Sequence, residues 1–188
     1  MSWWLVAGII LYNILSSEER EARERWEHKR EKVERSVKDH RKYIKAHLND
    51  AQQNCNFISL TSLHHSSVIA ANAGYNSLQD ARISLEAVGK MIVSTKEKRT
   101  ELENNLKLAR DKTEKIKIID ELKVYTELRK SLFPDKDKVK EQRNHLYKEV
   151  KRLNAETAEL KRYIRDGCGQ RGVDWYDRLE ERTRQRNC

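Results

Sequence analysis

The chain has 188 residues, of which 37% are hydrophobic and 37% are charged, and its formal net charge is +9. The apolar share is too small for a compact core of many layers, and six glycines with one proline are too few for a sheet or a loop-rich fold. The composition therefore predicts an all-α protein of long helices with narrow apolar seams.

The chain opens with an uncharged apolar run, Ser2 to Leu15, which is followed from Glu18 by a mixed-charge helical stretch. A free terminus in water gains little from such a run, so we expect residues 1–17 to form an apolar helix that anchors the chain in a membrane. The run is short, because a bilayer core of about 30 Å needs about 20 apolar helical residues. It also lacks the basic start and the cleavage site of a signal peptide. The predicted membrane-insertion residues are Trp3, Trp4, Leu5, Ile9, Ile10, Leu11 and Ile14.

Many basic residues follow this run and none precedes it, so the positive-inside rule places the N-terminus outside and the body in the cytoplasm. The predicted localisation is therefore that of a single-pass membrane protein. The alternative is that the same apolar surface closes one end of a soluble cytoplasmic oligomer. Cys55, Cys168 and Cys188 match neither a disulfide framework nor a metal motif, which favours a reducing compartment.

Residues 18–132 are expected to form a long antiparallel helical hairpin. Its break is predicted near residues 74–77, because Gly74 suits the end of a helix and Ser77 with Asp80 suits the start of the next. Around this break, residues 51–79 contain no Asp, Glu, Lys or Arg. Their small and amide side chains predict a helix–helix contact, within one chain or between chains.

A further coiled-coil helix is predicted over residues 134–166, opened by Pro134, which is tolerated in a first helical turn. Its apolar residues repeat at seven-residue intervals with a second set interleaved, which is typical of a coiled coil. The seam residues are Val139, Leu146, Val150, Leu153, Leu160 and Ile164.

The C-terminal part combines glycines with a basic segment. Residues 167–173 contain a G-x-G-x-x-G, but no strand precedes it, so we interpret it as a hinge rather than a dinucleotide site. Residues 174–188 predict a short basic helix. Interspersed acids dilute its arginines, which favours docking of a partner protein over binding of nucleic acid. The candidate docking residues are Trp175, Tyr176, Arg178 and Leu179.

The sequence contains no arrangement of residues that is typical of catalysis. Its carboxylates lie on charge-dense helical faces, its histidines lack metal-ligand spacing, and its cysteines have no local histidine partner. Seam or contact roles are favoured for the histidines, including His64 and His65. No catalytic, metal or cofactor site is predicted, and the chain is expected not to be an enzyme.

The primary hypothesis is a non-enzymatic, membrane-anchored coiled-coil scaffold or adaptor that forms a homo-oligomer and docks an unidentified partner protein. One alternative is an oligomeric membrane-disrupting or pore-forming effector. Another is a basic coiled-coil protein that binds nucleic acid, with Arg178, Arg182, Arg184 and Arg186 as the candidate contacts.

Overall fold

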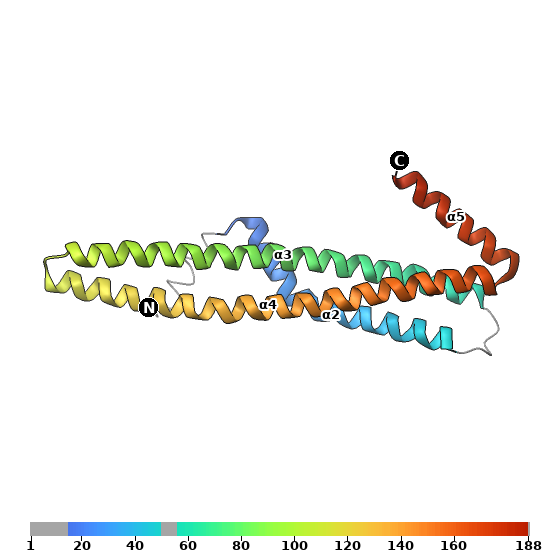
Figure 1. The fold of residues 1–188 in the computed structure, drawn as a ribbon, viewed down its shortest axis with the longest axis horizontal. Coiled ribbons are helices and arrows are strands. Elements are labelled where there is room, and N and C mark those ends of the chain that lie inside the picture. The colour runs from blue at the N-terminus through green and yellow to red at the C-terminus, as the bar shows by residue number, and fades with distance from the viewer. Residues whose placement is uncertain (1–14, 50–55, 188) are drawn as a thin grey trace. The chain divides into compact units, whose positions relative to one another are not determined.

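The computed structural model describes residues 15–49 and 56–187, which form four α-helices and no strand (Figure 1). This confirms the predicted all-α class. The helices are α2 (Ser17–Asn49), α3 (Phe57–Leu108), α4 (Lys112–Gly167) and α5 (Gly169–Asn187). The chain divides into two compact units. Unit 1 consists of residues 1–28 and 79–144, and unit 2 consists of residues 29–78 and 145–188.

Polar caps determine where three of the helices begin. The Ser16 hydroxyl accepts a hydrogen bond from the Glu19 backbone, and the Glu19 carboxylate accepts one from the Ser16 backbone, which makes a reciprocal capping box. The side-chain oxygen of Asn56 caps α3 by accepting a hydrogen bond from the backbone N–H of Ser59 at 3.2 Å. Asp111 caps α4 in the same way. These side chains satisfy N–H groups that have no partner within the helix.

The break predicted near residues 74–77 is wrong, because α3 runs without interruption from Phe57 to Leu108. Gly74 is needed for a close contact instead: a Cβ added there would lie 2.4 Å from a methyl group of Val150. Ser77 is buried, and Asp80 pairs with Arg25 rather than capping a helix. The turn between α3 and α4 lies at residues 109–111.

Pro134 lies inside α4 and does not begin a new helix. Proline removes the helical hydrogen bond to the Lys130 carbonyl, but Lys130 and Pro134 are exposed, so this carbonyl can be hydrated. Leu132 and Val139 on either side of it are buried. Packing of this apolar face keeps the helix continuous, so the predicted division at residue 134 is also wrong.

In unit 1, α3 and α4 form an antiparallel hairpin that closes at residues 109–111 (Figure 1). The first turns of α2 pack on it through Arg25 with Asp80 and Arg23 with Asp135. Partly buried Ile92 and Leu128 flank a core cluster. That cluster consists of Leu15, Ala87, Val88, Met91 and Leu132.

Within residues 15–49 and 56–187, no helix is long and apolar enough to cross a membrane. This finding overturns the predicted single-pass localisation with the N-terminus outside. Leu15, the described end of the apolar run, is only 4% exposed and packs against protein in the core of unit 1. The other predicted insertion residues lie outside the described residues: Trp3, Trp4, Leu5, Ile9, Ile10, Leu11 and Ile14.

In unit 2, α2 and α4 run parallel to each other, and α3 runs antiparallel to α4 (Figure 1). Residues 34, 41 and 45 of α2 meet residues 145, 149 and 156 of α4 in increasing order. Gly74 of α3 meets Val150, and Tyr75 accepts a hydrogen bond from Asn154. The buried apolar side chains of this unit are Val37, Ile44, Leu60, Ala70, Ala71, Leu146, Val150, Leu153, Leu160 and Ile164.

Helix α5 begins at Gly169, earlier than the predicted residue 174. The predicted seven-residue hinge is a sharp turn, in which Gly169 has a left-handed φ of 59°. Gly172 lies in the first turn of α5, where an added Cβ would be 2.1 Å from the Ile164 carbonyl oxygen. These two glycines of the G-x-G-x-x-G therefore allow the sharp turn between α4 and α5. Cys168, between them and α4, is disulfide-bonded, which its spacing did not predict.

Candidate functional site

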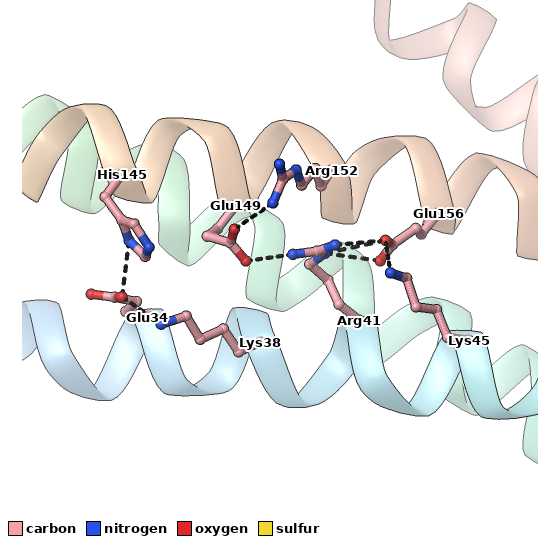
Figure 2. Close-up of polar contacts among 8 residues, drawn as sticks. All are labelled: Glu34, Lys38, Arg41, Lys45, His145, Glu149, Arg152 and Glu156. Atoms are coloured by element: carbon pink, nitrogen blue, oxygen red, sulfur yellow. Dashed lines mark hydrogen bonds and ion pairs between the residues drawn. The ribbon is translucent and has the colours of Figure 1, made fainter.

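The contact between α2 and α4 in unit 2 is charged, and Arg41 lies at its centre (Figure 2). Its guanidinium donates to both carboxylate oxygens of Glu156, at 2.9–3.2 Å, and to Glu149 at 2.5 Å. The side chains of all three residues are 9–14% exposed. The hydrogen bonds to Glu156, opposed by burial and reinforced by Glu149, raise the pKa of Arg41. Charge-assisted and bidentate bonds of this kind are the strong ones among protein hydrogen bonds.

Two further groups extend this network at its ends. Lys45 lies 3.5 Å from Glu156, and Arg152 donates to Glu149 at 3.1 Å. Glu34 lies two turns before Arg41 on α2. Its carboxylate contacts Lys38 at 2.8 Å and His145 of α4 at 3.0 Å (Figure 2).

The carboxylate of Glu34 is stabilised in its charged form. Burial opposes ionisation, but the hydrogen bond from Lys38 outweighs it, together with the charges of Lys38, His145 and Arg30, and the pKa of Glu34 is lowered. The three acids of the α2–α4 contact, Glu34, Glu149 and Glu156, therefore point inward, and each is shared by more than one basic group.

A shallow groove of about 550 Å³ lies where α2 and α4 meet beyond Arg41. Lys45 and Leu48 of α2 line one side, and Arg152 and Glu159 of α4 line the other. The groove is mixed in character, with two basic and two acidic side chains among its seven lining residues. The sequence did not single out Arg41, Glu149 or Glu156. The available signal was their position beside the buried apolar residues Ile44 and Val150.

The predicted docking residues of α5 face in different directions. The Trp175 ring meets the buried His64 ring edge-on, with 5.0 Å between centroids and 89° between planes. Lys161 and Arg165 of α4 lie over the Tyr176 ring, at 4.6 and 5.1 Å, and Lys161 also pairs with Glu180. Leu179 is half-buried and Arg178 is exposed. Two of the four residues thus hold α5 against its own chain.

The contact role predicted for the histidines is confirmed for His64, which is 7% exposed. Burial, together with the charges of Lys161 and His65, lowers the pKa of His64 to about 4. The imidazole is therefore neutral at physiological pH.

The predicted seam residues of α4 are all buried. Their packing lies within the chain, as Val150 against Gly74 illustrates. None of the six is more than 6% exposed: Val139, Leu146, Val150, Leu153, Leu160 and Ile164.

The outer face of α3 in unit 2 is exposed and carries no charge. Ile58 is 75% exposed, Ile69 is 55% exposed and Tyr75 is 46% exposed. Ile58 and Ile69 form one stripe with exposed polar residues, at alternating spacings of four and three residues. The stripe, which we call the α3 outer face, consists of Ile58, Ser62, His65, Ile69, Asn72 and Asn76, flanked by Val68 and Tyr75.

Within the residues that the structure describes, no group of three His, Cys, Asp or Glu side chains comes together in a way that could hold a metal ion. No protein-family model, no curated protein and no solved structure matches this chain.

Proposed function

We propose that this chain is a non-enzymatic helical scaffold that self-associates through the α3 outer face. The observation that carries the proposal is the exposure of Ile58, Ile69 and Tyr75 on a helix segment without a single charge. Isolated apolar side chains on a surface are ordinary, but four large ones, those of Ile58, Val68, Ile69 and Tyr75, are exposed on this one uncharged stretch, which favours an interaction site. The α3 outer face extends over residues 58–76, or about 27 Å of helix at 1.5 Å per residue.

A second copy of the chain is the occupant that the charges favour. The chain has a net charge of +9, so most pairings of two copies bring like charges together. The α3 outer face is free of this repulsion, since residues 51–79 contain no charged side chain. A twofold pairing uses the same patch on both copies and therefore needs no complementary surface elsewhere. Each large apolar side chain that becomes fully covered contributes roughly 1.5–3 kcal/mol.

Ile69→Glu tests this proposal. It places a charge in the middle of the α3 outer face without touching a buried residue. We expect association, measured by sedimentation velocity over a concentration series, to weaken at least about tenfold, equivalent to about 1.4 kcal/mol.

Val93→Glu is the matched control, because Val93 lies on the same helix, in unit 1, and is also 55% exposed. It should leave association unchanged. A wild-type chain that stays monomeric at every concentration, or equal losses in the two variants, would contradict the proposal.

A further inference from the structure

The positive charge of the chain is concentrated in unit 2. Unit 2 contains 19 Lys and Arg against 12 Asp and Glu, a net charge of +7, whereas unit 1 contains 20 against 18, a net charge of +2. Within unit 2, residues 29–49 of α2 alone carry eight basic residues against three acidic ones. The surface of this helix is therefore the most basic part of the unit.

The acids of the α2–α4 contact offset only part of its positive charge, because three carboxylates pair with five Lys and Arg side chains. The side chains of Glu34, Glu149 and Glu156 are only 16%, 9% and 13% exposed. By contrast, the side chains of Lys38, Lys45 and Arg152, which pair with them, are 51–61% exposed. Each acid is shared between at least two basic groups, so positive charge remains in excess at the surface.

The exposed basic side chains form a ridge along the outer side of the α2–α4 pair. Four of them follow α2 at spacings of three and four residues and span about 15 Å at 1.5 Å per residue. Two more come from α4, on the other side of the α2–α4 contact. The basic ridge consists of Arg35, Lys38, Lys42 and Lys45 of α2 with Lys148 and Arg152 of α4. Glu31, Asp39 and Glu159 are exposed acids beside the ridge, and Glu31 pairs with Arg30.

The ridge lacks the apolar anchors that a protein partner uses. Interfaces between proteins rely on buried aromatic or aliphatic residues at their centre. Tyr43 and Tyr147 are exposed, but each is displaced about 100° around its helix from its neighbour in the ridge, on the side away from the other helix. What remains is a straight row of cations, which suits the evenly spaced phosphates of a nucleic acid backbone.

From these observations we infer that the basic ridge binds the phosphate backbone of nucleic acids without reading their sequence. Phosphate contacts position a protein on nucleic acid, whereas base contacts provide specificity, and the ridge offers only the former. This surface differs from the C-terminal arginines that the sequence suggested. The inference does not depend on self-association, because the α3 outer face and the ridge have no residue in common.

The test is binding of a fluorescently labelled mixed-sequence DNA duplex of about 20 base pairs, followed by anisotropy between about 50 and about 200 mM salt. The variant Arg35→Gln/Lys42→Gln/Lys148→Gln removes three exposed charges of the ridge and none of the ion pairs described above. Since each lost phosphate contact flattens the log–log salt dependence by about 0.9, we expect the slope to fall by about 2.7. Affinity at the lower salt concentration should fall at least about tenfold.

A matched variant, Arg110→Gln/Lys136→Gln/Lys140→Gln, removes the same three charges from exposed positions of unit 1. It should retain the wild-type salt slope, and circular dichroism should show that both variants remain folded. Equal losses in the two variants would overturn the inference, because net charge rather than the ridge would then drive binding. Absence of binding at low salt, or equally tight binding of poly-glutamate, would also overturn it.

Discussion

Helix α4 packs against its two neighbours in unit 2 in different ways. Toward α3 it presents Val150 to Gly74, a contact that depends on shape and on the absence of a side chain. Toward α2 it presents Glu149 and Glu156 to Arg41, a contact that depends on charge pairing. Three acids of this unit, Glu34, Glu149 and Glu156, are turned into the α2–α4 contact, so exposed basic side chains predominate on its outer side. The α3 side uses no charge, and its outer face remains neutral.

The largest expected effect comes from breaking the charged contact. Arg41→Met leaves Glu149 and Glu156 poorly hydrated and without their main partner. Removing one member of a buried ion pair costs about 3 kcal/mol or more, and we expect a loss of that size in the free energy of unfolding by urea. Arg152→Met is the control, because Arg152 also bonds Glu149 but its side chain is 61% exposed. It should cost less than about 1 kcal/mol, and equal losses would contradict the assigned role of Arg41.

A somewhat smaller effect is expected from the shape-dependent contact. Gly74→Val forces α3 away from Val150, and overpacking of this kind costs about 2 kcal/mol, again measured by urea unfolding. Gly89→Val tests the same substitution on the same helix where an added Cβ meets nothing within 4 Å. The double variant Gly74→Val/Val150→Ala should recover most of the loss, since it restores the space. A Gly74 variant no less stable than its Gly89 counterpart would show that the close approach is unimportant.

The smallest effect concerns the α5 contact, where an aromatic pair contributes about 1 kcal/mol. While Trp175 covers His64, the neutral imidazole is favoured, with Lys161 of α4 and His65 of α3 adding to the effect of burial. The pKa of His64 lies at about 4, below its ordinary value of 6.5. The contact is therefore at full strength above pH 6.5 and weakens as the pH falls toward 4.

An NMR titration of the His64 ring measures this directly. We expect a midpoint near 4 in the wild-type chain and a higher midpoint, closer to 6.5, in Trp175→Ala, because the ring becomes accessible to water. Hydrogen exchange in residues 169–187 should increase as the pH falls from 6.5 toward 4. A wild-type midpoint at 6.5, or no change in the variant, would show that α5 does not cover His64.

Local patterns predicted the class of the fold and the buried face of α4. The heptad residues from Val139 to Ile164 are buried as expected, because helical periodicity reports which side of a helix avoids water. Helix boundaries were predicted less well. Gly74 and Pro134 resemble helix ends when considered alone, but packing of the residues around them keeps both helices continuous.

The charged contact and the α5 contact could not be predicted, for a different reason. Spacing of four residues within one helix is visible in the sequence, and the local pair of Glu34 with Lys38 is of this kind. Arg41 instead pairs with residues 108 and 115 positions further along the chain, and His64 meets a ring 111 positions away. Such partners depend on which helices become neighbours, and periodicity within one helix contains no information about that.

The most direct test of self-association is photo-crosslinking from a benzophenone side chain placed at Asn72, in the α3 outer face, and separately at Ala46, an exposed position of α2. The proposal predicts a cross-linked homodimer from position 72, with the linked peptide mapping to α3 of the second copy, and little or none from position 46. No dimer from position 72, or equal yields from the two positions, would contradict it.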